Sequence, residues 1–295
     1  MKLITIDSGD RECRNMTSTT LHRNLRMHPR TVVFSLAYGA SLLAAPASAL
    51  TTQAPGHVSD AEAARLLRDV YREKVTLQGD WPAVSTANDN EESAPTSRTV
   101  CADSGAQSPG PRRIAVCTSF ADAGHAQSGE VDLFLLLDPR GAETQARIGA
   151  SERGITSGGW GTPGKVEFFE IGPGRAAFAL TSGYANMGWA TESISLHHAE
   201  NDRFVHMLTV STHLSNTGAC DPDEDRTCRK RSISLDCALR TDKNRYHHGV
   251  YDLVVSVTGE RGGKKVARSI PVPFAGDVYR APAEALRRDG CDEGF

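Results

Sequence analysis

The sequence predicts a mainly β fold, an antiparallel meander forming a sandwich or a barrel-like sheet, with one N-terminal amphipathic helix. From residue 112 onward, short segments rich in apolar residues recur at close intervals. The chain also contains 27 glycines and 14 prolines, which suit the many turns between short strands. Most of the connections have only a few residues, and a parallel crossover needs a dozen or more, so the strands are expected to pair in antiparallel fashion.

The first 49 residues have the three parts of a secretory signal peptide. Arg23, Arg26 and Arg30 precede an apolar run at residues 32–45, and a small-x-small cleavage pattern follows, ending at Ala49. The run is well short of the ~20 residues that a membrane-spanning helix needs. We therefore expect cleavage after Ala49 and a periplasmic or secreted product with no transmembrane anchor.

The position of the basic segment raises a question about the start of the chain. A polar stretch of 26 residues precedes Met27, whereas signal peptides usually begin close to their basic residues. Met1, Met16 and Met27 are therefore all candidate starts, and the sequence does not choose among them.

Cysteine usage agrees with export. One cysteine, Cys13, lies in the segment expected to be removed, and six remain. An even number in an oxidising compartment favours three disulfides, although sequence alone permits 15 connectivities. Because short loops are the easiest to bridge, the expected pairs are Cys101–Cys117, Cys220–Cys228 and, left over, Cys237–Cys291. A zinc site is not expected, since the chain has no C-x-x-C pair.

The segment after the cleavage site begins with a helix signal. Ser59 and Glu62 form a capping box. Apolar residues then recur at three- and four-residue spacing, namely Ala63, Leu66, Leu67, Val70, Tyr71 and Val75. We expect one amphipathic helix at about residues 60–75, packed on a sheet or covering its edge. Residues 78–111 lose this periodicity and are expected to form a long polar surface loop.

The strands follow in sequence order. They are expected at residues 112–119, 131–138, 143–149, 165–171, 175–182, 191–198, 203–211, 231–239, 250–258 and 265–274. A meander of this length must curl, split into two sheets or close. The sequence therefore divides into an N-terminal extension with signal peptide at 1–49, a helix with a long loop at 50–111, and an antiparallel β domain at 112–295.

The histidines do not predict a metal site. His197 and His198 are consecutive on an expected strand, so their side chains point to opposite faces of the sheet. His206 and His213, seven residues apart, also face opposite ways. A metal would need ligands from different strands, for example His198 with His206 across the hairpin. We predict neither a metal nor a cofactor.

An acidic run at residues 221–225 has oxygen ligands at alternate positions, as a calcium loop does. It lacks the glycine and glutamate that an EF-hand needs at its sixth and twelfth positions, where this chain has Arg226 and Ser232. Basic residues follow at once, at positions 226, 229, 230 and 231, and would neutralise the carboxylates. A solvated hairpin tip is favoured over a calcium site.

No catalytic motif is present. The chain contains no G-x-S-x-G, S-x-x-K or H-E-x-x-H sequence. Paired carboxylates from separate strands would leave no sequence signature. The net charge of −3 gives no basic excess for phosphates, which argues against a nucleic-acid partner.

Aromatic residues in glycine-rich or polar loops are the best candidates for binding. Such loops contain Trp160, Tyr184, Trp189 and Tyr246, and Asn186 lies between Tyr184 and Trp189. Loop aromatics can anchor a sugar ring or a partner protein. The alternative is that they close the ends of the core, as most buried aromatics do. The segment 182–189 is the first target for mutation.

Three functions remain compatible with the sequence. The favoured one is an exported, non-catalytic envelope protein that binds a protein or glycan through loops at one end of the β domain. The alternative is an exported hydrolase whose acidic or histidine residues converge from separate strands. A structural subunit that exposes an edge strand is the third. A histidine and a carboxylate within hydrogen-bond reach in a cleft would favour the hydrolase.

Overall fold

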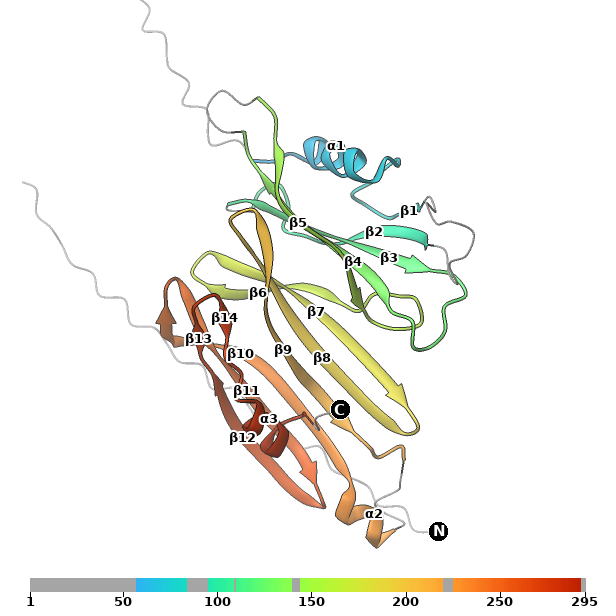
Figure 1. Cartoon of the computed structure of the whole chain (residues 1–295), viewed down its shortest axis with the longest axis vertical. Coiled ribbons are helices and arrows are strands. Elements are labelled where there is room, and N and C mark those ends of the chain that lie inside the picture. The colour runs from blue at the N-terminus through green and yellow to red at the C-terminus, as the bar shows by residue number, and fades with distance from the viewer. Residues whose placement is uncertain (1–56, 84–94, 109, 140–143, 220–224, 293–295) are drawn as a thin grey trace, which may run out of the picture. The chain divides into compact units, whose positions relative to one another are not determined.

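The computed structural model describes residues 57–83, 95–108, 110–139, 144–219 and 225–292, all within one compact unit at residues 52–295 (Figure 1). The predicted mainly β, antiparallel fold is confirmed, with the sheets in a sandwich-like arrangement. The predicted signal peptide and its cleavage after Ala49, together with the candidate starts Met1, Met16 and Met27, lie outside the described residues.

Helix α1 (Asp60–Tyr71) forms where the capping box predicts it. The Ser59 hydroxyl accepts a hydrogen bond from the Glu62 amide at 3.3 Å, and the Glu62 carboxylate accepts one from the Ser59 amide at 3.1 Å. The helix ends four residues before Val75, because Arg72 adopts a left-handed conformation (φ 58°) that terminates it. Its apolar face shares a core with the first sheet.

The first sheet has five strands in sequence order: β1 (Asp80–Pro82), β2 (Pro95–Asp103), β3 (Arg112–Phe120), β4 (Gly129–Leu137) and β5 (Arg147–Ser157). The prediction of a continuous loop at 78–111 is therefore wrong, since β1 and β2 lie within it. Strand β2 was hard to recognise because it contains polar residues, and one of them, the half-buried Arg98, forms an ion pair with the buried Glu73. The strand expected at 143–149 instead starts at Arg147 and runs to Ser157.

The second sheet contains β6 (Val166–Gly172), β7 (Arg175–Asn186), β8 (Trp189–Glu200), β9 (Arg203–Ser215), β10 (Ile233–His247), β11 (Val250–Arg261) and β12 (Lys264–Val272), hydrogen-bonded in the order β12 to β6. The chain between β9 and β10 includes the short helix α2 (Arg226–Arg231). The ribbon β13 (Phe274–Ala275) and β14 (Val278–Tyr279) and the helix α3 (Ala283–Asp289) follow β12.

This second sheet folds into two layers. Strands β9 and β10 pair through only three residue pairs, from Ser234↔Ser215 to Asp236↔His213. Beyond them the strands diverge, as Figure 1 shows. One apolar core then joins the β6–β9 layer to the β10–β12 layer, including Leu196 and Leu235. The outcome is a sandwich in which a single hydrogen-bonded ladder connects both layers.

The other face of β6 and β7 packs on the first sheet. Val166, Phe178 and Leu180 share a core cluster with Val131 and Leu133 of β4. Successive residues of a strand point to opposite faces, so β7 can contribute to both cores. The first sheet is therefore anchored on the β6–β9 layer by its own apolar contacts.

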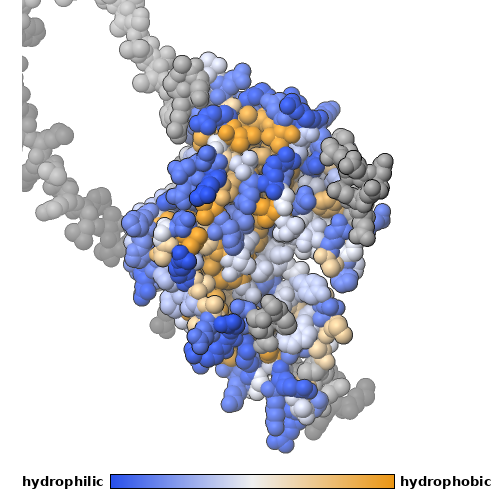
Figure 2. Space-filling view, viewed as in Figure 1, coloured by the Kyte–Doolittle hydropathy of each residue, from blue (hydrophilic) through white to orange (hydrophobic). Residues whose placement is uncertain are grey.

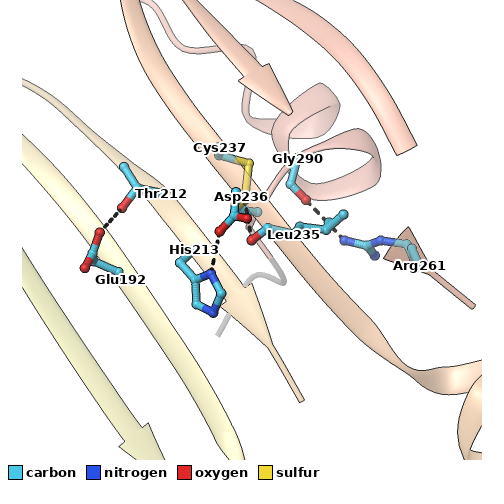
Figure 3. The surroundings of a disulfide bond; sticks show 9 residues. Glu192, Thr212, His213, Leu235, Asp236, Cys237, Arg261 and Gly290 are labelled. Atoms are coloured by element: carbon cyan, nitrogen blue, oxygen red, sulfur yellow. Dashed lines mark hydrogen bonds and ion pairs between the residues drawn. A yellow bond between two sulfur atoms is a disulfide. The ribbon is translucent and has the colours of Figure 1, made fainter. Parts of the chain in front are cut away.

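Two of the predicted disulfides are present, Cys101–Cys117 and Cys237–Cys291. The first links β2 to β3. The second joins β10 to the residues after α3, and Figure 3 shows Arg261 donating to the Gly290 carbonyl beside it (3.2 Å). Cys228 on α2 is also disulfide-bonded, and its predicted partner Cys220 lies outside the described residues.

Candidate functional site

A small polar hollow lies between the β7–β8 hairpin and the loops of the first sheet. Its volume is about 220 Å³, and its lining consists of His125, Ala126, Ser128, Gly158, Ser182, Gly183, Tyr184, Thr191 and Ser193. We call these nine residues the hydroxyl cleft. The lining contains four aliphatic hydroxyls, one phenol and one imidazole, but no Lys, Arg, Asp or Glu side chain.

The strand register explains why the hydroxyls converge. Ser182 lies opposite Ser193, and Tyr184 lies opposite Thr191. Residues directly opposite in an antiparallel pair share a face, and so do residues two apart on one strand. Phe178 lies further along the same face of β7, inside the core against the first sheet. The cleft is therefore the polar, outer continuation of the inter-sheet core.

Glycines let the loop after β5 pack closely on β7. The Gly158 amide donates to the Ser182 hydroxyl at 2.9 Å, and the Ser128 hydroxyl donates to the Gly158 carbonyl at 3.3 Å. Gly158 has a φ of +74°, and a Cβ there would lie 2.1 Å from the Thr162 carbonyl oxygen. The cleft wall thus depends on a position that only glycine can occupy.

The backbone of Trp160 is held in an unfavourable conformation beside the cleft. Its φ is +55°, and 71% of its surface is exposed. The left-handed region costs a non-glycine residue about 1–2 kcal/mol. Its ring lies 5.7 Å from that of His125, which lines the cleft. A strained, exposed tryptophan gains little from burial, so the core-closing alternative does not fit Trp160, and such strain is concentrated at functional sites.

Tyr184 lies in the cleft with 47% of its surface exposed. Two of the four predicted ligand-binding residues, Tyr184 and Trp160, are thus placed within or next to one hollow. The other two, Asn186 and Trp189, lie outside the hydroxyl cleft. Asn186 and Trp189 pair with each other across a two-residue turn.

The expectation that residues 182–189 form a loop is wrong. Strands β7 and β8 continue to a turn at Met187 and Gly188, whose φ values are +49° and +80°. Two positive φ values are the hallmark of a tight hairpin turn that matches the strand twist. Trp189 packs against the sandwich core, so the core-closing alternative holds for this residue.

A second hollow lies at the end of the same hairpin. We call it the hairpin groove; its volume is about 420 Å³, and it is lined by Ala185, Asn186, Met187, Gly188, Trp189, Ala190, His213, Ser215, Thr217 and Gly218. The His213 Nδ1 donates to Asp236 Oδ1 at 2.8 Å, as Figure 3 shows. Among the described residues the Nε2 of His213 makes no hydrogen bond, so it can accept one from a ligand.

A hydrogen bond between two side chains also connects the second sheet to the first. The Nδ1 of buried His197 donates to Glu152 Oε2 of β5 at 3.2 Å. Burial lowers the pKa of His197, with Glu152 opposing and His206 reinforcing the shift. His206 lies opposite His197, with ring centroids 5.1 Å apart, so the expected approach of His198 to His206 is wrong.

His198 points the other way, as the alternation of a strand requires. Its Nδ1 donates to the Ala176 carbonyl at 3.1 Å, and its Nε2 accepts from Arg175 at 3.1 Å. Burial lowers its pKa as well. Over the described part of the chain, no group of three or more His, Cys, Asp or Glu side chains could hold a metal ion.

Ser182 lies in the segment 182–189 singled out from the sequence, whereas the sequence did not single out the cleft residues His125, Ser128, Thr191 and Ser193. A signal existed for the last two, because Thr191, Ser193 and Ser195 alternate with other residues and so mark one polar face of a strand. Nothing in the sequence indicated that this face meets the loop carrying His125.

No protein-family model, curated protein or solved structure matches this chain. Within the described ranges, no helix is long and apolar enough to cross a membrane.

Proposed function

We propose that this protein is an exported, non-catalytic binding protein that holds a neutral glycan of the cell envelope in the hydroxyl cleft. The observation that carries the proposal is the combination of an uncharged, hydroxyl-rich lining with an exposed aromatic residue, Trp160, held in a strained conformation at its side.

The chemistry of the lining favours a sugar. The Thr191 hydroxyl can donate one hydrogen bond and accept two, and the Ser193 hydroxyl, which donates to the Ser182 carbonyl at 3.5 Å, can still accept; both suit the hydroxyls of a carbohydrate. A lining without Lys, Arg, Asp or Glu offers no counter-charge to an ionic ligand. The rings of Trp160 and Tyr184 supply apolar faces on which a sugar ring can stack.

The size of the cleft limits the ligand. At about 220 Å³ it is smaller than the roughly 300–1,000 Å³ typical of drug-sized ligands. One sugar ring, or the end of a longer chain, is therefore the expected occupant. Export is supported by the N-terminal pattern and by the two disulfides, since disulfides persist mainly in oxidising compartments.

The test is a screen of the purified protein against neutral and charged oligosaccharides, followed by calorimetric titration of any glycan that binds. Trp160→Ala should weaken binding by at least about tenfold, as expected for a central aromatic anchor. Tyr246→Ala is the matched control, because Tyr246 is also exposed (54%) but lies at the end of β10. Equal losses in both variants, or binding of charged glycans alone, would contradict the proposal.

The hairpin groove supports a second candidate, the exported hydrolase. His213 is oriented by Asp236 in the manner of a general base, and its Nε2 has no partner among the described residues. In this case His213 would take a proton from water, the water oxygen would attack an acyl carbon, and the proton would pass to the leaving alcohol. His213→Gln should abolish hydrolysis of a chromogenic ester, and His206→Gln should not. Activity that survives His213→Gln would exclude this candidate.

A further inference from the structure

Four segments meet at one end of the molecule: α2, the β11–β12 turn, the turn at residues 216–219 and the β7–β8 turn. The Gly262 amide of the β11–β12 turn donates to the Ser232 carbonyl just after α2, at 2.8 Å. The Asn216 side chain donates to the Arg231 carbonyl at 2.9 Å, which fixes the 216–219 turn against the same helix. A Cβ added at Gly188 would lie 2.1 Å from the Ala219 amide nitrogen, so the β7–β8 turn packs on this turn too.

Besides Arg229, which has an interaction of its own, five exposed cations lie on two of these segments: Arg226, Lys230 and Arg231 on α2, and Lys264 and Lys265 at the start of β12. We call them the basic end. None of the five forms an ion pair within the described part of the chain; the expected neutralisation of the acidic run at 221–225 concerns carboxylates that lie mostly outside the described residues. This end is hydrophilic in the space-filling view (Figure 2).

Among the described residues, fewer acidic than basic side chains lie near the basic end. Asp225 caps α2, accepting a hydrogen bond from the Thr227 amide at 2.7 Å, and Glu260 lies opposite Lys265 on β11. Three further acids, Asp221, Asp223 and Glu224, precede α2 in the sequence and lie outside the described residues.

One apolar side chain projects from the adjoining turn. Met187 has 87% of its surface exposed, at the tip of the β7–β8 hairpin. At this position the Met187 side chain is free to contact an apolar phase. Apolar groups next to a cluster of Lys and Arg are the usual composition of surfaces that rest on anionic lipid.

We propose that the basic end, with Met187, is a docking surface for an anionic lipid bilayer. The five cations are distributed over a helix and a hairpin turn instead of converging on one point, which suits a field of headgroups better than a single small anion. Each Lys or Arg near such a surface contributes about fivefold in affinity at low salt. Docking would place the protein at the membrane. This proposal is independent of which ligand occupies the hydroxyl cleft.

The experiment is co-sedimentation of the full chain with vesicles of phosphatidylcholine containing roughly one-third phosphatidylglycerol, compared with pure phosphatidylcholine. Every variant keeps the same residues 1–56, so any lipid binding by that segment cancels in the comparison. The wild type should bind the anionic vesicles more tightly than pure phosphatidylcholine, and high salt should remove this difference. The triple variant Arg226→Gln/Lys230→Gln/Arg231→Gln should bind at least about tenfold more weakly.

The control removes three exposed cations elsewhere, Arg68→Gln/Lys74→Gln/Arg203→Gln, and should bind as the wild type does. Met187→Ser should cost a few-fold in affinity without changing the salt dependence, because it removes apolar contact and no charge. Equal weakening in both triple variants, or equal wild-type binding to the anionic and the pure phosphatidylcholine vesicles, would overturn the proposal. Binding to a soluble anionic polysaccharide but not to the vesicles would also overturn it and would assign the surface to a polymer.

Discussion

Two buried histidines predict that the protein loses stability as the pH falls from neutral to mildly acidic. His197 is 5% exposed and His198 is 9% exposed, and burial lowers the pKa of each below its ordinary value. In the unfolded chain each would titrate near 6.5. Below that pH the unfolded chain binds more protons than the folded one, so the free energy of unfolding must decrease as the pH falls.

The size of the effect is bounded by the number of protons. Each histidine can change the free energy of unfolding by at most about 1.4 kcal/mol per pH unit below its unfolded pKa. Together they allow a slope of up to about 2.7 kcal/mol per unit, beginning near pH 6.5 and ending below their folded pKa values. Glu152 moderates the slope through its contact with His197, since it favours the charged imidazole.

This slope can be measured by urea unfolding, followed by circular dichroism, at several pH values between roughly 7.5 and 5.5. Carboxylates remain largely ionised over this pH range. The variant His197→Gln/His198→Gln should flatten the slope, whatever the variant does to stability at neutral pH. A wild-type stability that stays constant or rises as the pH falls would refute the reasoning. So would a slope that the double variant leaves unchanged.

Three further predictions concern stability, each measured by urea unfolding. Tyr71→Phe should cost about 2 kcal/mol, because the buried Tyr71 hydroxyl donates to ionised Asp132 at 2.6 Å. Gly188→Ala should cost at least about 2 kcal/mol, since φ is +80° and the new Cβ would approach the Ala219 nitrogen to 2.1 Å; a neutral effect would show that this turn can shift. Cys291→Ser should cost about 4 kcal/mol by opening a disulfide with a sequence separation of 54, and a loss under about 1 kcal/mol would contradict the chain-entropy argument.

The sequence was a good guide to elements whose signals are local. The capping box at Ser59 placed the start of α1, and two of the cysteine pairs followed from spacing and parity. The sequence was a poor guide where tertiary contacts offset the cost of burying polar residues within a strand. Strand β2 was missed because an arginine such as Arg98 suggests a solvent-exposed loop, whereas the fold half-buries it in an ion pair with the buried Glu73.

The candidate site shows the same limit. The exposed aromatics Trp160 and Tyr184 could be selected from their glycine-rich surroundings, and both lie in or beside the hydroxyl cleft. Trp189 has similar neighbours but packs into the core, because the hairpin continues through Gly183 to a tight turn at Met187. Which face of β8 meets the His125 loop depends on the stacking of two sheets, and no local pattern encodes it.

The measurement that tests the proposed glycan site most directly is a crystal structure of the protein soaked with a neutral oligosaccharide found in the binding screen. The proposal predicts a sugar ring in the hydroxyl cleft, hydrogen-bonded to Thr191 or Ser193 and stacked on Trp160 or Tyr184. A sugar bound in the hairpin groove at His213, or a cleft left empty by every glycan that binds in solution, would contradict it.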